Sequence, residues 1–332
     1  MKKAIKGLYK VLALAAVLCV MVSCTPGKTN PASGGQSSGK SAASADGSAG
    51  VNPESQMKSE ETNMTNSLTE SAVKSGTGAS SKKAESSGPQ ASQGAASSGA
   101  KNITVGGRKY SLTFEDDFSG TSLDLSKWSR CPQWERADKN TWRNNRVKLD
   151  GKGSLVLEAG KDGEVYSSGA VRTHSKFDQV YGYYEIRCRL QQTTGFWSAF
   201  WLMGYEVGKV GDGGKDGAEI DIFESFDKPG SQINHGVHWD GYEADHKSEA
   251  KAVTVPGIYE GWHTFALEWT KTAYIFYIDG VETWRTDAGG ICETPLYVKV
   301  STEVGFWAGQ MQESDPLPNL LVDYVRVYQA AD

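Results

Sequence analysis

Three carboxylates stand close together in one apolar stretch, Gly217 to Ser225, which reads Gly-Ala-Glu-Ile-Asp-Ile-Phe-Glu-Ser. Alternate residues of a β-strand point to the same face, so Glu219 and Asp221 share a face and the isoleucines between them point to the other. Glu224 joins that face only if a β-bulge absorbs one residue after Asp221, and bulges of this kind are frequent beside active sites. The stretch therefore predicts a bulged strand with three acids on one face.

Like charges on one strand face repel one another, and a purely structural role rarely needs three of them. The pattern is typical of glycoside hydrolysis, in which one carboxylate is the nucleophile and a second is the general acid/base. The middle acid would then tune their protonation. A solvated strand face and a calcium site are the two alternatives that the stretch alone leaves open.

The run Glu-Ile-Asp-Ile-Phe-Glu resembles the E-x-D-x-x-E signature of glycoside hydrolase family 16. Its bulged form is that of bacterial laminarinases and agarases, not the shorter E-x-D-x-E of lichenases. The resemblance covers nearly all of residues 110–328, including Trp-Arg-Asn-Asn at 142–145 and Asp-Tyr-Val-Arg-Val-Tyr at 323–328. It implies that Glu219 is the nucleophile, Glu224 the acid/base and Asp221 the assisting acid, with no cofactor for catalysis.

Aromatic residues supply the candidates for substrate binding. The segment 195–203 resembles the family's G-x-W-P-A-F-W-L segment, with Ser198 in place of proline. Trp and Tyr rings can hold a sugar chain by apolar contact and dispersion, although about half of the aromatics, Trp262 and Trp269 among them, are expected in the core. The predicted substrate-binding set is Trp197, Trp201, His238, Trp239, Arg187 and Trp307.

Two histidines follow the acidic stretch. His235 and His238 are three residues apart and face opposite sides of a regular strand, which argues against a shared zinc site. His238 alone resembles the histidine that lines the cleft in laminarinase-like members, and a hydrogen-bonded structural histidine is the open alternative.

One segment departs from the family pattern. Where laminarinases usually have an Asn-Leu-Ala-Val-Gly-Gly type segment near the donor sugar, residues 299–309 read Lys-Val-Ser-Thr-Glu-Val-Gly-Phe-Trp-Ala-Gly. The departure leaves the glucan preference open.

Short alternating runs separated by Gly, Pro, Asn and Asp predict an all-β domain. We expect strands at 109–114, 154–159, 181–190, 197–203, 218–225, 233–239, 263–270, 274–279 and 320–328. Asp279-Gly280 between two apolar runs predicts a type I′ hairpin. The expected fold is an antiparallel two-sheet sandwich, which the resemblance sharpens to a jelly roll with a concave substrate cleft.

The start of the chain has the features of an export signal. Residues 1–24 combine four lysines with an apolar run too short for a confident membrane span. Met21-Val22-Ser23-Cys24 resembles a lipobox, so Cys24 is the predicted lipidation site of an extracellular, membrane-anchored lipoprotein, with full secretion as the alternative. Residues 25–101, rich in Ser, Gly and Ala, predict a disordered linker to a catalytic domain at 102–332.

Charge and cysteine content limit the partners. The formal net charge is −5 and no basic stripe is present, which argues against nucleic acid. Cys131, Cys188 and Cys292 form either one disulfide and a free thiol or three buried thiols, and Cys188 is expected to face the core. Asp117, Gly153 and Asp323 match a structural calcium site of the family, an ion compatible with oxygen ligands. Pairing of Asp323 with Arg326 or Arg108 is the open alternative.

Taken with the resemblance, these residues predict a monomeric retaining endo-β-glucanase acting on the polysaccharides β-1,3- or mixed β-1,3/1,4-glucan. An agarase-like galactan hydrolase and a transglycosylase of the same fold are close alternatives. A non-catalytic glycan-binding sandwich is a distant one, because it would not need all three acids.

Overall fold

The structure, a computed structural model, describes residues 99–133, 140–312 and 316–331. The predicted signal peptide, its Cys24 and nearly all of the predicted linker lie outside the described residues. Within them, no helix is long and apolar enough to cross a membrane.

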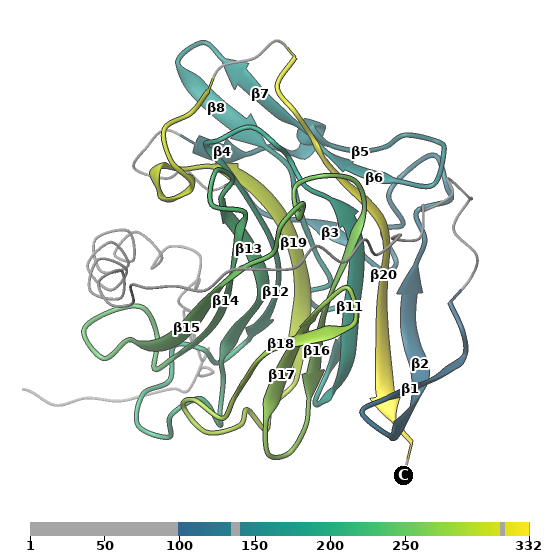
Figure 1. Ribbon diagram of the computed structural model, residues 1–332, viewed down its shortest axis with the longest axis vertical. Helices are drawn as coiled ribbons and strands as arrows, with labels where there is room; N and C mark the ends of the chain where they lie inside the picture. The colour runs from purple at the N-terminus through teal and green to yellow at the C-terminus, as the bar shows by residue number, and fades with distance from the viewer. Residues whose placement is uncertain (1–98, 134–139, 313–315, 332) are drawn as a thin grey trace, which may run out of the picture. The chain divides into compact units, whose positions relative to one another are not determined.

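Two large antiparallel sheets form the domain, and they curve against each other as two layers (Figure 1). The eight-stranded sheet has the order β15-β14-β13-β12-β19-β9-β3, with β10 beside β19. Its strands are β15 (Lys247–Thr254), β14 (Gln232–Trp239), β13 (Glu219–Asp227), β12 (Phe196–Gly204), β19 (Leu296–Val304), β9 (Ala170–Arg172), β3 (Ser129–Arg130) and β10 (Asp178–Gln179).

The nine-stranded sheet has the order β1-β2-β20-β11-β16-β17-β18, with β6 beside β20 and β5 beside β6. Its strands are β1 (Asn102–Val105), β2 (Arg108–Asp116), β20 (Leu320–Ala330), β11 (Gly182–Arg189), β16 (His263–Trp269), β17 (Tyr274–Ile278), β18 (Val281–Thr286), β6 (Leu155–Leu157) and β5 (Val147–Leu149). A small third sheet of β4 (Asn140–Trp142), β8 (Val165–Ser168) and β7 (Ala159–Asp162) lies at one end (Figure 1), and the described 3₁₀ turns are Asn144–Arg146 and Phe306–Ala308.

The core lies between the two large sheets, where each strand turns its alternate apolar residues inward. Ile220 and Phe223 of β13 belong to this core together with Phe265 and Leu267 of β16, and the rings of Phe223 and Phe265 lie 4.2 Å apart. The predicted all-β sandwich is confirmed. What remains for chemistry is the other face of the eight-stranded sheet.

Local predictions compare well with the observed elements. Asp279 and Gly280 have φ angles of 49° and 76° at the turn between β17 and β18, as a type I′ hairpin requires. Among the longer strands, β19 and β15 were missed, and so were several short ones such as β1 and β8. β19 carries polar residues at alternate positions yet is buried throughout, and β15 is a mostly exposed edge strand.

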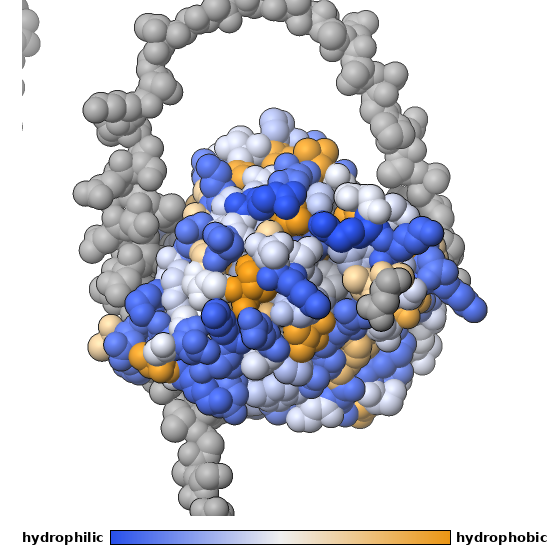
Figure 2. Space-filling view, turned by 90° about the horizontal axis from the view of Figure 1, so that it is seen from below, coloured by the Kyte–Doolittle hydropathy of each residue, from blue (hydrophilic) through white to orange (hydrophobic). Residues whose placement is uncertain are grey.

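The three cysteines Cys131, Cys188 and Cys292 are buried and form no disulfide with one another, and Cys188 faces the core as expected. The face seen in Figure 2 is mostly hydrophilic, with apolar residues in small groups. Among the described residues the exposed large hydrophobic side chains are Leu125, Tyr205, Val210 and Val281.

Candidate active site

The predicted bulge lies in β13, between Asp221 and Glu224. Toward β14, Asp221 pairs with Gly236 and Glu224 with Asn234, so three steps on β13 match two on its neighbour. The extra residue lets Ile222 and Phe223 both join the core and returns Glu224 to the face of Glu219 and Asp221. All three acids are buried, with 3%, 4% and 4% of their surface exposed.

Glu224 is held by two hydrogen bonds from neighbouring strands. Trp197 Nε1 donates to Oε1 at 3.0 Å, and Asn234 Nδ2 donates to Oε2 at 2.9 Å. Burial and the nearby charge of Asp221 raise the pKa of Glu224 well above the usual carboxyl range, and the Asn234 bond opposes them only partly. A carboxyl group of this kind keeps its proton toward neutral pH and can donate it to a leaving group.

Glu219 has a different environment on the same face. The hydroxyl of Tyr242, from the loop after β14, donates to Glu219 Oε2 at 2.6 Å. A hydrogen bond to the ionised form stabilises it, as a nucleophile requires. The two glutamates are therefore distinguished by their partners, tryptophan and asparagine for one and tyrosine for the other.

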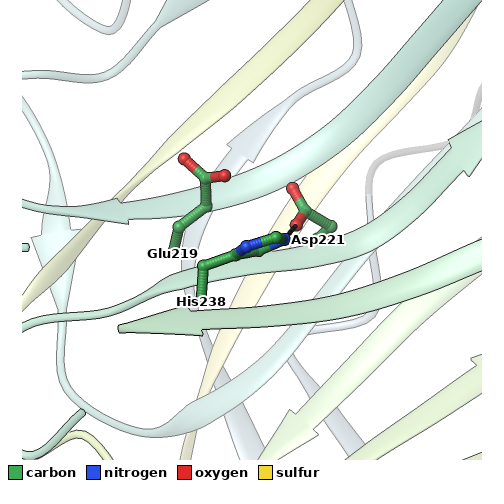
Figure 3. A group of neighbouring side chains, drawn as sticks. All are labelled: Glu219, Asp221 and His238. Atoms are coloured by element: carbon green, nitrogen blue, oxygen red, sulfur yellow. Dashed lines mark ion pairs between the residues drawn. The ribbon is translucent and has the colours of Figure 1, made fainter. Parts of the chain in front are cut away.

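Asp221 lies between Glu219 and Glu224 along β13. It faces His238 of β14, with Glu219 nearby (Figure 3). His238 Nε2 is 3.3 Å from Asp221 Oδ2, an ion-pair distance, and Oδ2 has no hydrogen-bond partner. Burial and then the charge of Glu219 raise the pKa of Asp221 well above its ordinary value, while Lys299 acts in the opposite direction. Glu219 and Asp221 therefore share a strong mutual repulsion, which their surroundings must balance.

Gly236 makes room for this pair. A Cβ atom at position 236 would lie 2.8 Å from Asp221 Oδ2 and 3.3 Å from His238 Nε2. Any larger residue would displace one of the two side chains. Glycine is thus required here by close approach of side chains from β13 and β14.

His238 is backed by a second imidazole. Its Nδ1 lies 3.0 Å from Nε2 of His246, and the two rings stack with centroids 5.2 Å apart. Burial and the neighbouring His238 lower the pKa of His246 to about 4, so His246 is neutral over the working range of most enzymes. His235 points to the opposite side, where its Nδ1 lies 2.7 Å from the carbonyl of Ile222, which confirms that the two strand histidines cannot share a metal.

Donor atoms of Glu219, Asp221 and His238 lie within 4.8 Å of one another, a spacing that also suits a cation. Tyr242 and His246 already contact two of these groups. Because Glu219 and Glu224 have distinct hydrogen-bond partners on one face of the sheet, we assign the cluster to acid–base chemistry.

Trp197 and Trp307 lie together at the Glu224 end of the row. Their ring centroids are 4.8 Å apart, and Trp307 stacks on Phe226 at 4.8 Å and 17°. Both tryptophans are only partly buried. They form an aromatic surface beside the acid/base.

The other three predicted binding residues, Trp201, Trp239 and Arg187, are each occupied by contacts within the protein. Trp201 faces the site but is only 3% exposed, with the ammonium of Lys299 3.7 Å from its ring centroid. The ring of Trp239 packs against the backbone of Gly289, where a Cβ atom would lie 2.6 Å from Trp239 Cδ2. The structure does not bring Arg187 to the catalytic strand, because β11 places it on the outer face of the other sheet.

Arg187 instead contacts a residue predicted to bind calcium. Its Nη1 lies 2.5 Å from Oδ2 of Asp323. Asp117 and Gly153 approach the same level of β20, since Asp116 pairs with Val325 and Leu155 with Val322. The three candidates thus converge on β20 of the nine-stranded sheet, whereas β13 belongs to the eight-stranded sheet. Oδ2 of Asp323 is already engaged by the guanidinium of Arg187.

Sequence reasoning missed three residues that contact the acids or lie beside them: Asn234, Tyr242 and Gly236. Asn234 and Gly236 could have been found, because both share the face of His238 at alternate positions of one strand. Tyr242 lies in a loop with no periodic signal. Lys299 was noticed only as a departure from a family segment.

Comparison with known proteins agrees with this geometry. Residues 135–326 match the family model "Glycosyl hydrolases family 16". The endo-1,3-1,4-beta-glycanase EglC of Rhizobium meliloti (strain 1021) is 30% identical over 178 residues, which are 53% of this chain and 36% of that protein. The keratan-sulfate endo-1,4-beta-galactosidase of Sphingobacterium multivorum is 26% identical, with 73% of this chain and 60% of that protein covered.

Solved structures show the same fold. SCLam, described as a non-specific endo-beta-1,3(4)-glucanase from family GH16, superposes with a TM-score of 0.59 and 26% identity over 72% of this chain and 98% of that chain. The matched part of this chain covers little more than a third of the length of EglC. The bulged strand, its three acids and the match over residues 135–326 lead to one conclusion: the chain belongs to glycosyl hydrolase family 16.

Proposed function

We propose that this chain is a retaining endo-β-glucanase that hydrolyses β-1,3- or mixed β-1,3/1,4-glucan by double displacement. The observation that carries the proposal is the bulge of β13, which aligns three buried acids on one face and gives each a different environment. Relatives named for β-glucan hydrolysis support the substrate class.

In the first step Glu219 attacks the anomeric carbon while Glu224 protonates the oxygen of the leaving sugar. The hydrogen bond from Tyr242 aims the Glu219 carboxylate, and Trp197 and Asn234 fix the Glu224 carboxyl group. In the second step the same Glu224, now ionised, removes a proton from water, which attacks the glycosyl-enzyme. Two inversions at the anomeric carbon retain its configuration.

Asp221 contributes through charge and not through contact with the reacting bond. Its negative charge raises the pKa of Glu224, which favours the protonated acid that the first step needs. His238 faces the Asp221 carboxyl group, with its Nε2 3.3 Å from Asp221 Oδ2. The charge of Asp221 thus favours the protonated form of Glu224 that the first step needs.

The test is product analysis on a substrate panel. The protein should release reducing sugar from laminarin or lichenan, and proton NMR should show the β-anomer as the first product. Glu224→Gln serves as the matched inactive control. An α-anomer as first product would exclude the retaining mechanism, and release from neither glucan would exclude the substrate class.

A galactan is the second candidate substrate. The residues at 299–309 differ from the laminarinase segment, and a keratan-sulfate galactosidase is among the relatives. Agarose and keratan sulfate therefore belong in the panel beside xyloglucan, and chain-length analysis of the products separates hydrolysis from transglycosylation.

We also propose that Cys24 carries a lipid that anchors a monomeric enzyme to the outer face of a membrane, with residues 25–101 as its tether. The lipobox-like Met21-Val22-Ser23-Cys24 supports this location. Cys24→Ala should move the protein from the membrane fraction to the soluble fraction. Unchanged membrane association would contradict the anchor, and light scattering of the released protein tests the monomer.

A structural calcium ion at Asp117, Gly153 and Asp323 completes the proposal. Convergence of the three residues on β20 supports it, provided that Asp323 Oδ1 serves the cation while Oδ2 stays with Arg187. Calcium should raise the melting temperature relative to EGTA in the wild type and not in Asp323→Asn. Equal melting temperatures of the wild type in both buffers would contradict the site.

A further inference from the structure

One buried cation lies beside the catalytic acids without having a role in the double displacement. Lys299 of β19 is fully buried, with 0% of its surface exposed. Its neighbours Val298 and Val300 face the core between the sheets, so Lys299 points to the catalytic face. A buried ammonium is costly unless opposite charge compensates it.

Two aromatic rings hold the ammonium in place. Lys299 Nζ lies 3.7 Å from the ring centroid of Trp201 and 5.2 Å from that of Trp142. Trp201 is itself fixed, because its Nε1 donates to Ser301 Oγ at 3.2 Å. Cation–π contacts stabilise the position of the charge but cannot neutralise it.

Strand register shows where the compensating charge lies. Trp201 of β12 pairs with Lys299 on one side and with Asp221 on the other. An ammonium seated over the Trp201 ring therefore leans across β12 toward β13. Asp221 lies on that side, and its Oδ2 is buried without a hydrogen-bond partner. The positive charge of Lys299 favours the ionised form of this carboxyl group.

We propose that Lys299 is a positioning residue of the catalytic centre: its buried ammonium, seated over Trp201, supplies positive charge that favours the ionised form of Asp221 beside Glu219. Lys299 acts through Asp221 and does not touch the substrate. The inference rests on the proposed glycosidase function and extends it to a residue in the segment that departs from the family pattern.

Other charged groups surround this pair. Asp221 is faced by Glu219 and Glu224 on its own strand and by His238 of β14, behind which His246 lies. Lys299 is faced by Arg172, its register partner on β9. Glu303 also lies on β19 and points to the same face of the sheet as Lys299. Trp201 pairs with Lys299 of β19 on one side and with Asp221 of β13 on the other, so Lys299 is the residue of β19 that lies in register with Asp221.

The consequence is a specific change in pH dependence. Glu219 must be ionised to attack, so kcat/KM falls at low pH when the pair of Glu219 and Asp221 takes up a proton. Removing the positive charge makes the pair bind that proton at higher pH. The acid limb of the kcat/KM profile should move upward by about half to one pH unit, with KM unchanged.

Lys299→Met removes the charge and keeps the length of the side chain, and Lys299→Arg keeps the charge. Lys228→Met is the matched control, because Lys228 is also buried but its Nζ contacts the carbonyls of Phe196 and Ser225. The shift should appear in Lys299→Met, be absent in Lys299→Arg and be absent in Lys228→Met. An acid limb that stays in place in Lys299→Met, or moves equally in Lys299→Arg, overturns the proposal.

A measurement independent of turnover separates this inference from the function itself. Aspartate carboxyl carbons labelled with ¹³C can be titrated by NMR, with Asp221 identified by its absence in Asp221→Asn. Its titration should move to higher pH in Lys299→Met, or in Lys299→Gln if the methionine variant does not fold. An unmoved Asp221 titration overturns the role of Lys299. A wild-type protein that hydrolyses no glycan of the panel refutes the proposed function alone.

Discussion

Two buried glutamates of this molecule are similarly hidden from water yet have opposite surroundings. Glu268 of β16, on the nine-stranded sheet, is 0% exposed and receives Arg108 at 2.6 Å and the hydroxyls of Tyr110 and Tyr277 at 2.6 and 3.0 Å. Glu224 of β13 is 4% exposed and receives two neutral donors beside two further acids.

The difference separates a structural charge from a functional one. Glu268 has a cation and two hydroxyl donors, so its ionised form is compensated where it stands. Glu224 is crowded by like charge, and its pKa is raised well above the ordinary range. Burial alone would not distinguish the two residues. Incomplete compensation marks the one that has to exchange a proton.

The largest effect is expected for loss of the nucleophile. Glu219→Gly should lower kcat/KM by at least about 10³-fold, because the glycosyl-enzyme cannot form. Azide should enter the space left by the side chain and restore turnover, giving an α-glycosyl azide. Glu224→Ala should instead give the β-glycosyl azide from a substrate with a good leaving group. Reversed anomers would exchange the two roles, and Glu268→Gly should show no azide rescue.

A second effect concerns the proton on Glu224. Wild-type kcat/KM should fall as pH rises through the raised pKa of Glu224, because the acid is then lost. Glu224→Gln should lower activity on natural glucan by about 10²- to 10⁴-fold and abolish this alkaline limb. Glu268→Gln should keep both the activity and the limb. A limb that persists in Glu224→Gln would assign the proton to another group.

The same two substitutions should differ in the free energy of unfolding. Glu268→Gln should cost about 1–3 kcal/mol, because Arg108 and two tyrosine hydroxyls lose a charged acceptor. Glu224→Gln should stabilise the protein. The folded-state pKa of Glu224 is raised, so its ionisation destabilises the fold increasingly as pH rises from the ordinary carboxyl pKa toward the raised one. Urea unfolding at pH 4 and 7 tests both, and destabilisation by Glu224→Gln at pH 7 would contradict the comparison.

The smallest of these effects tests geometry without removing any charge. Gly236→Ala places a methyl group 2.8 Å from Asp221 Oδ2, and a shift of this kind should lower kcat by about tenfold. Gly120→Ala is the matched control, since its nearest heavy atom would lie at 3.5 Å on the outer part of the domain. Equal kcat values for the two variants would show that Asp221 tolerates displacement.

The sequence was sufficient for the catalytic strand and its bulge. Alternation placed Glu219 and Asp221 on one face, and the family signature required the extra residue before Glu224. The Asp279-Gly280 turn could also be predicted from local sequence, because the two central residues determine a type I′ hairpin. Features of this kind depend on neighbours within a few positions.

Partners of the acids could not be predicted in the same way. Trp197 reaches Glu224 across β12, and Tyr242 reaches Glu219 from a loop, so both contacts depend on strand register and loop path. β19 was missed for a related reason. Its Lys, Ser and Glu alternate with apolar residues, as in a strand with one solvated face, whereas every residue of this strand is buried.

The bulge has a consequence for the length of the catalytic strand. Ile222 and Phe223 both point into the core. The strand therefore contains one more core side chain than a regular strand with the same three acids on one face would. Deletion of Ile222 would leave Glu-Ile-Asp-Phe-Glu, in which simple alternation already returns the last glutamate to the catalytic face. A strand of this kind can gain or lose one residue without changing which acids meet the sugar, and the cost, about 2–5 kcal/mol for a lost isoleucine, falls on the core.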